Sequence, residues 1–172
     1  MAELTGIVLA GGRSRRMGED KASLMLDGVS LLQRCVDRLA SVVDELVLVG
    51  APGRALPAVV SELPMRTVED PVEGEGPLMG IAVGLEVASA TVAVVVAVDM
   101  PLLEPELLRL LASRVSPTHR WVVPFAHERP QPLCSAFSVD ALTVIRAHLD
   151  AGDRAPMALA ADLDAYRMQA EE

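Results

Sequence analysis

The residues with the clearest capacity for chemistry lie near the start of the chain. Gly11 and Gly12 follow an apolar run at positions 7–10, which reads as a buried strand. Four basic side chains come within the next nine residues, and these are Arg13, Arg15, Arg16 and Lys21. Glycine lets a backbone turn sharply, and such a turn can direct backbone N–H groups at an anion. The pattern therefore predicts a site for a polyphosphate.

Lys21 is the only lysine in a chain that contains fourteen arginines. A lysine here indicates a need for a compact ammonium rather than a planar guanidinium. The glycine spacing matches neither the P-loop nor the dinucleotide-binding fingerprint. The alternative interpretation is a solvated basic loop with a lysine that is there by chance.

Two acids follow later strands in the same way. Asp70 follows a predicted strand at 66–68, and Asp99 follows an unbroken apolar strand at 91–98. Ligands of open α/β sheets bind beyond the carboxyl ends of the strands, so both acids should lie near the glycine turn. Carboxylates beside phosphates favour Mg²⁺. The alternatives are a helix-capping role for Asp99, a plain loop position for Asp70, and solvated side chains at Arg13 and Arg16.

Alternating strand and helix patterns predict the fold. Strands are expected at 7–10, 45–49, 66–68, 91–98, 121–124 and 132–137. Helices are expected at 30–43, 58–63 (weak), 78–88, 104–115, 139–149 and 153–161, with Ser30 as an N-cap and Gly152 as a C-terminal stop. The pattern predicts an α/β fold of one domain, residues 1–172. Its doubly wound, mostly parallel sheet forms a three-layer α/β/α sandwich with a late antiparallel strand around 121–137.

Composition excludes several classes of function. A net charge of −9 argues against nonspecific nucleic-acid binding, and the cations at 13–21 stand out against this acidic background. Cys35 and Cys134 are isolated, so a zinc site is not expected. The longest apolar stretch, at 88–98, is too short to span a bilayer, and no signal segment is recognised. We expect a cytoplasmic protein with no membrane partner.

The stretch at 9–21 closely resembles the signature of the molybdenum cofactor guanylyltransferases. That signature reads Leu-Ala-Gly-Gly, a variable residue, Ser, a variable residue, Arg-Met-Gly and then Asp-Lys, and each fixed position is matched. The resemblance continues at Asp70, at the loop 76–80, at 98–101 and at 152–154. It covers roughly residues 4–160 of the chain.

The resemblance implies a Rossmann-like nucleotidyltransferase fold and a Mg²⁺-dependent transfer of GMP from GTP to the phosphate of molybdopterin, with release of pyrophosphate. The implied catalytic residues are Lys21, Arg13, Arg16 and Asp99, with Asp99 as the metal ligand. The implied nucleotide-binding residues are Leu9, Ala10, Gly11, Gly12, Arg13, Lys21, Asp70, Gly76, Pro77, Leu78 and Asp99. Gly152 and Arg154 fall on the acceptor side. Transient contact with other molybdenum cofactor proteins is also implied.

Two departures from the family pattern leave alternatives open. The usual C-terminal Asn-x-Asn-Thr-Pro segment is missing, and Gly50-Ala51 stand where an asparagine usually follows the second strand. One alternative is a related nucleotidyltransferase that uses CTP or another phosphate acceptor. The other is a nucleotide-binding homologue with reduced catalysis.

Overall fold

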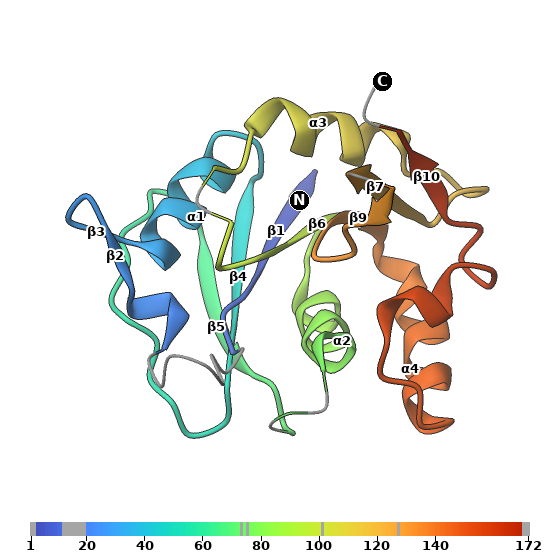
Figure 1. The fold of residues 1–172 in the computed structure, drawn as a ribbon, viewed down its shortest axis with the longest axis horizontal. Helices are drawn as coiled ribbons and strands as arrows, with labels where there is room; N and C mark the ends of the chain where they lie inside the picture. Colours follow the sequence, from blue (N-terminus) through green and yellow to red (C-terminus); the bar gives the residue numbers. More distant parts are fainter. Residues whose placement is uncertain are drawn as a thin grey trace.

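A mixed β-sheet runs through the middle of the molecule (Figure 1). The computed structural model describes residues 3–11, 20–72, 74, 76–100, 102–126 and 128–169. The strands are β1 (Leu4–Leu9), β4 (Glu45–Gly50), β5 (Met65–Glu69), β6 (Val92–Ala97), β7 (Trp121–Ala126), β8 (Arg129–Pro130), β9 (Cys134–Ser138) and β10 (Tyr166–Met168). The sheet order is β10-β7-β9-β6-β1-β4-β5, and β8 pairs with β7.

The strand directions confirm the predicted sheet. β1 is parallel to both of its neighbours, β4 and β6, and β5 is parallel to β4. β9 is antiparallel to β6 and β7, which makes it the expected late antiparallel strand. The central strands carry Val and Ile without alternation because both faces of the sheet are covered. At the centre, Ile7 lies between Val47 and Val95.

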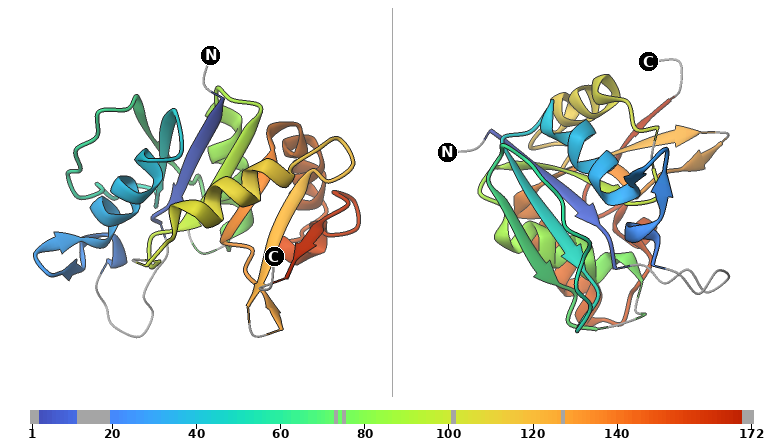
Figure 2. Two further views of the ribbon diagram at one scale, coloured as in Figure 1. Left: turned by 90° about the horizontal axis from the view of Figure 1, so that it is seen from above. Right: turned by 90° about the vertical axis from the view of Figure 1, so that its left-hand side faces the viewer.

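Helices cover both faces of this sheet and complete the three layers. Helices α1 (Leu31–Ala40) and α3 (Pro105–Arg114) lie on one face, and α2 (Pro77–Val87) and α4 (Leu142–Asp150) lie on the other (Figure 2). Three short 3-10 helices are η1 (Lys21–Ser23), η2 (Val139–Ala141) and η3 (Pro156–Leu159). Two apolar cores result, one on each side of the sheet. This arrangement confirms the predicted α/β/α sandwich.

The largest buried side chain belongs to the second core, under α2 and α4. Trp121 is fully buried, and its ring stacks on Phe137 with ring centres 5.3 Å apart. Its indole Nε1 donates a hydrogen bond to Ser135 Oγ at 3.1 Å. Because the polar N–H of a buried tryptophan needs a partner, this bond lets the ring be buried without leaving its N–H unpaired.

Residues 58–63 do not form the expected helix. The side-chain amide of Gln33 in α1 pairs with the backbone of Val60: its Nε2 donates to the Val60 carbonyl, and the Val60 N–H donates to its Oε1, both at 2.8 Å. Pro57 and Pro64 border the segment. The pairing resembles a strand contact and holds the chain extended, so a tertiary contact overrides a weak local preference.

The two ends of the described chain also differ from expectation. The sequence patterns did not predict β10, and the helix expected at 153–161 is reduced to η3. Near the start, β2 (Met25–Leu26) and β3 (Val29–Ser30) form a small hairpin that leads into α1. Ser30 Oγ accepts a hydrogen bond from Gln33 N, which confirms the predicted cap.

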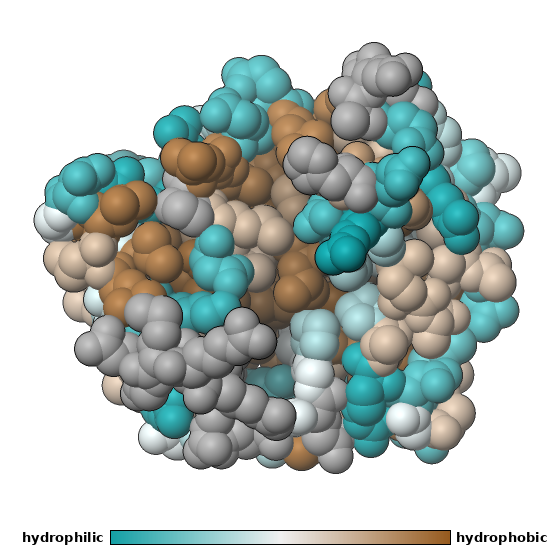
Figure 3. Space-filling model, viewed as in Figure 1, coloured by the Kyte–Doolittle hydropathy of each residue, from teal (hydrophilic) through white to brown (hydrophobic). Residues whose placement is uncertain are grey.

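The hairpin stands out from the body of the molecule and carries apolar side chains into solvent. Met25 is 64% exposed, and apolar surface is visible over the hairpin in Figure 3.

Among the residues that the structure describes, none of the helices has the length and apolar character needed to cross a bilayer.

Candidate nucleotide-binding site

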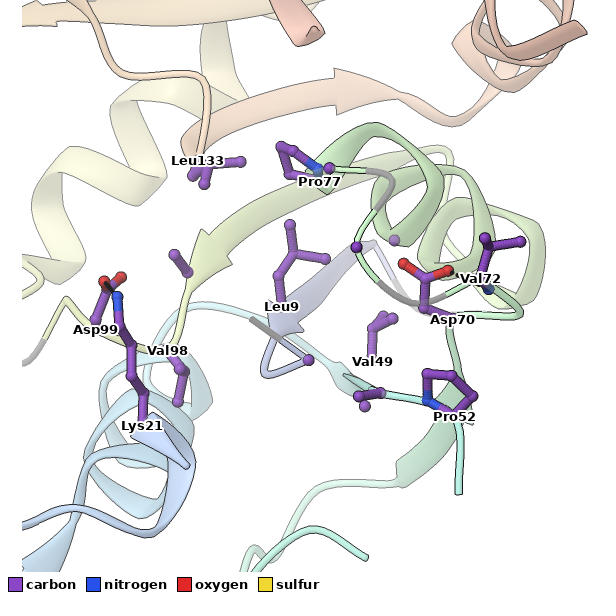
Figure 4. A pocket seen from close by; sticks show the side chains of 17 residues that line it. Leu9, Lys21, Val49, Pro52, Asp70, Val72, Pro77, Val98, Asp99 and Leu133 are labelled. Atoms are coloured by element: carbon purple, nitrogen blue, oxygen red, sulfur yellow. Dashed lines mark hydrogen bonds and ion pairs between the residues drawn. The ribbon is translucent and has the colours of Figure 1, made fainter. Parts of the chain in front are cut away.

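A pocket of about 550 Å³ opens where β1, β4, β5 and β6 end and α2 begins (Figure 4). Its floor is apolar, with Leu9, Val49 and Val98 contributed by three neighbouring strand ends. Polar groups lie at two opposite ends of this floor. The volume falls in the range of small-molecule sites, and the position is where α/β sheets bind ligands.

Lys21 and Asp99 form the first polar end. Lys21 Nζ lies 2.5 Å from Asp99 Oδ2, although the two residues are 78 positions apart in the chain. Lys21 opens η1, which Asp20 caps by accepting a hydrogen bond from Ala22 N at 3.1 Å. Ala22 is fully buried and anchors this turn in the first core. Both charged side chains stay partly exposed, at 37% and 43%, so they remain accessible to a ligand.

Cys35 supports the strand end that carries Asp99. Its thiol donates to the Val98 carbonyl at 3.5 Å. Burial raises the pKa of Cys35 to about 11, so the thiol stays neutral. Cys35 is fully buried in the first core.

Asp70 forms the second polar end, beside the start of α2. Its backbone N–H donates to the Gly50 carbonyl at 2.9 Å, and its Oδ1 accepts from Val72 N at 3.0 Å. Its Oδ2 is 3.7 Å from the point where a Cβ at Gly80 would lie. The carboxylate is therefore held against the first turn of α2, on the far side of the pocket from Lys21 (Figure 4).

Gly76 is the N-cap of α2 and borders the same end. Its φ of 88° lies in the region that favours glycine, and α2 has no side-chain cap. A Cβ at this position would lie 3.2 Å from the Arg154 carbonyl oxygen. Since the first N–H groups of a helix have no partners within it, this end of α2 can donate hydrogen bonds to a ligand.

Gly11 is constrained by the neighbouring strand as well as by any ligand. A Cβ on Gly11 would lie 2.9 Å from Ala51 N and 3.0 Å from the carbonyl carbon of Gly50. Both are backbone atoms, so they cannot turn aside as a flexible side chain could. The sequence pattern assigned Gly11 to ligand approach, and the structure adds a packing reason. Gly12, Arg13 and Arg16 lie outside the described residues.

The sequence as a whole matches a known family. A family model for the MobA-like NTP transferase domain matches residues 6–166. The chain belongs to the MobA-like NTP transferase family. This membership makes it a nucleotidyltransferase.

Relatives and solved structures agree with the MobA-like assignment. A protein of Mycobacterium avium named probable molybdenum cofactor guanylyltransferase is 38% identical over 171 residues, which cover 96% of this chain and 85% of that protein. The structure of molybdopterin-guanine dinucleotide biosynthesis protein A from Archaeoglobus fulgidus superposes with a TM-score of 0.76 at 24% identity, covering 97% and 84% of the two chains. The structure of a Mycobacterium tuberculosis protein in complex with manganese superposes with a TM-score of 0.69 at 24% identity, and the match covers 97% of this chain and 86% of that chain. These two structures show the shared fold.

The MobA-like fold brings most of the described site candidates into the pocket. The predicted residues that line it are Leu9, Gly11, Lys21, Asp70, Gly76, Pro77 and Asp99. Ala10 and Leu78 lie behind the lining. Ala10 N donates to the Val49 carbonyl at 2.8 Å, and Leu78 is fully buried in the second core.

The predicted acceptor residues lie at the end of α4 and do not line the pocket. Gly152 has a φ of 93° where α4 stops. Arg154 Nη1 donates to the carbonyls of Leu149 and Asp153, both at 2.9 Å. The Arg154 carbonyl oxygen and Cβ approach Gly76, at 3.2 and 3.8 Å from the point where a Cβ on Gly76 would lie. The guanidinium thus stabilises the end of α4.

His148 fixes the same segment, and the sequence patterns did not single it out. Its Nδ1 lies 2.7 Å from Asp153 Oδ2, and its Nε2 lies 2.8 Å from Asp162 Oδ2. The hydrogen bonds to Asp153 and then Asp162 raise the pKa of His148 above its ordinary value. Because Asp162 is 14 positions away, no local pattern marks this cluster.

The pocket lining also includes residues that were not among the predicted site residues. Gly50, Ala51 and Pro52 line it where the family usually has an asparagine, and Leu133 lies beside the mouth near Pro77. Gly50, Ala51 and Pro52 could have been marked by their positions at the end of β4 and directly after it. Within the described part of the chain, no three His, Cys, Asp or Glu side chains are grouped so as to hold a metal ion by themselves.

Proposed function

We propose that this chain is a divalent-metal-dependent guanylyltransferase. It transfers GMP from GTP to the terminal phosphate of a molybdopterin-type acceptor and releases pyrophosphate. The observation that carries the proposal is one pocket with a Lys21–Asp99 pair at one end and Asp70 beside the α2 N-terminus at the other. The names of the relatives support the same acceptor.

The Lys21 end suits the triphosphate. An oxygen of the acceptor phosphate attacks the α-phosphorus of GTP, and the bond from that phosphorus to the bridging oxygen of pyrophosphate breaks. The attacking group is already an anion, so no general base is required. Lys21 supplies positive charge where negative charge accumulates. Arg13 and Arg16 follow the glycine turn in sequence and are assigned the same role.

The donor set at this end fits Mg²⁺. This ion usually takes one or two carboxylates and completes its shell with phosphate oxygens and water. Asp99 offers one partly exposed carboxylate at the end of a buried strand. When bound, the ion would neutralise phosphate charge. The manganese complex of a structural relative supports a divalent metal of this kind.

The Asp70 end suits the guanine base. A carboxylate accepts hydrogen bonds, and guanine presents neighbouring N–H donors on one edge. The uncapped start of α2 lies beside Asp70 and can donate to a carbonyl oxygen of the base. The apolar floor between the two ends would lie under the ribose. The alternative nucleotide, CTP, would place a smaller base against the same Asp70 carboxylate.

The test is GTP binding and pyrophosphate release, each titrated against Mg²⁺ with a molybdopterin-type acceptor. We expect GTP to bind more tightly than CTP in wild type. Asp99→Asn keeps the size of the side chain, so the fold should remain while the Mg²⁺ dependence of GTP binding is largely lost and turnover drops sharply. Asp150→Asn, an exposed acid at the end of α4, is the matched control for lost charge. Overlapping curves for wild type and Asp99→Asn would overturn the metal role, and preference for CTP would overturn the guanine assignment.

A further inference from the structure

The Lys21–Asp99 ion pair joins two groups that the proposed reaction needs separately. Lys21 Nζ lies 2.5 Å from Asp99 Oδ2. In the proposed function the carboxylate binds a divalent cation and the ammonium binds phosphate. Two cations repel each other at such distances, so one oxygen cannot serve both at full strength.

We propose that Lys21 is a resting-state counter-ion that keeps Asp99 from binding a divalent cation until a nucleotide polyphosphate draws the ammonium away. This inference rests on the proposed function, because it takes Asp99 as the metal ligand. Its consequence is that metal and nucleotide bind cooperatively, each favouring the state that the other needs.

The backbone on both sides of the pair is held in place, so only the side chains have to move. The Lys21 carbonyl accepts from Leu24 N at 3.2 Å, and the cap by Asp20 fixes the residue before it. On the other side, Val98 N donates to the Leu9 carbonyl at 3.1 Å and the Val98 carbonyl accepts from Cys35. The lysine side chain is long and flexible, and its partial exposure leaves room for the ammonium to turn.

The strength of the pair is suited to displacement. Partly exposed ion pairs contribute little net free energy, because solvent screens them and two side chains must be ordered. A triphosphate offers several oxygens and a larger negative charge than one carboxylate, so it competes effectively for the ammonium. A divalent cation alone has to compete with Lys21 and also meets its repulsion. Removal of the ammonium should therefore tighten metal binding.

The experiment measures Mn²⁺ binding to the nucleotide-free protein by the loss of the free-ion electron paramagnetic resonance signal. Lys21→Met keeps the length of the side chain and removes its charge, and we expect Mn²⁺ to bind about three- to tenfold more tightly. Lys21→Arg keeps the charge and should bind Mn²⁺ as weakly as wild type. Arg146→Met is the matched control. Arg146 on α4 forms an ion pair with Glu86 on α2 at 2.7 Å, and both side chains are partly exposed, as in the Lys21–Asp99 pair. This control should leave Mn²⁺ affinity unchanged.

A second measurement adds GTP. In wild type, GTP should tighten Mn²⁺ binding, whereas in Lys21→Met this enhancement should shrink because no ammonium has to be withdrawn and GTP itself binds less well. Equal Mn²⁺ affinities of wild type and Lys21→Met without nucleotide would overturn the inference. An equal gain in Mn²⁺ affinity in Lys21→Met and Arg146→Met would also overturn it.

The Asp99→Asn variant separates this inference from the proposed function. If Asp99→Asn weakens Mn²⁺ binding in both the wild-type and Lys21→Met backgrounds, Asp99 is the metal ligand and the comparison of Lys21 variants decides the inference. If Asp99→Asn leaves Mn²⁺ binding unchanged in both, the metal assignment of the proposed function fails, and the inference fails with it.

Discussion

Gly11 has no Cβ, so the end of β1 can lie directly against the end of β4. The nearest atoms to an added Cβ are the backbone atoms of Gly50 and Ala51, at 2.9 to 3.2 Å. Relief of such a clash requires the two strand ends to move apart. These ends carry the floor of the pocket, so the constraint combines packing and binding at one residue.

Gly11→Ala should therefore lower the free energy of unfolding by about 1–3 kcal/mol, as is usual when a methyl group is forced into a filled space. Chemical denaturation with urea measures this. Gly50→Ala is the matched control, because the nearest atoms to its Cβ would belong to the flexible Leu56 side chain, at 3.4 Å or more. Equal losses in the two variants would contradict the packing argument.

The clustering of the candidate site residues was predictable where the signal was local. The glycine turn, the lone lysine, and the acids after two strands all pointed to one sheet edge, and the described members of that set line one pocket. Arg154 shows the limit. Its guanidinium donates to the Leu149 and Asp153 carbonyls at the end of α4, a local helix-end contact rather than one made in the pocket.

At the scale of elements, the segment after α4 depends on a histidine clamp. His148 bonds to Asp153 and Asp162, and between these two acids lies η3. The clamp thus fixes the segment whose Arg154 carbonyl approaches Gly76, the N-cap of α2. Through this approach the segment borders one end of the pocket.

The clamp should make stability depend on pH. Because the folded-state pKa of His148 is raised, its contribution is complete below the unfolded-state pKa of about 6.5 and is lost as pH rises through the folded-state pKa. His148→Gln should lower the free energy of unfolding by about 1 kcal/mol at acidic pH, and less at alkaline pH. Urea denaturation at several pH values tests this. His119→Gln is the control, because the His119 ring bonds to the backbone carbonyl of Asp164, whereas His148 bonds to two carboxylates. A pH-independent difference for His148→Gln would refute the clamp.

Most elements could be predicted because their patterns were strong. Unbroken apolar runs marked the central strands, and Ser30 and Gly152 marked helix ends. The failures share a cause. The segment at 58–63 takes its shape from Gln33, and β10 exists because β7 offers it a partner. Such contacts between distant parts of the chain leave no periodicity in the sequence.

At the scale of the whole molecule, the end of the sheet opposite the pocket holds a buried acid. Glu45 Oε1 accepts from Thr5 Oγ1 at 2.6 Å and from Ser89 N at 2.5 Å, and Arg66 lies 3.8 Å from Oε2. Burial by itself raises the pKa of Glu45, but these hydrogen bonds and the charge of Arg66 outweigh it, so the pKa is lowered. The network joins β1, β4 and β5 to the turn before β6.

This network should make the fold sensitive to acid. With a lowered folded-state pKa, the contribution of Glu45 is present above its unfolded-state value of about 4.3 and is lost as pH falls through the folded-state pKa. Glu45→Gln should cost about 1–3 kcal/mol near pH 7 and should flatten the loss of stability in acid. Glu106→Gln, at an exposed ion pair on α3, should change stability by less than about 0.5 kcal/mol. Thermal unfolding across acidic pH would contradict the assignment if both variants followed the wild-type curve.

The burial of Trp121 gives the molecule an internal optical reporter. It is the only tryptophan in the chain, and it begins β7 and stacks on Phe137 of β9, whereas the pocket opens where β1, β4, β5 and β6 end. Its fluorescence should be that of an indole shielded from water, and should shift to longer wavelength when the second core opens. Because the ring lies outside the pocket lining, emission follows the integrity of this core even when a nucleotide is present. One chromophore can thus compare the folding of wild type and site variants under the same ligand conditions.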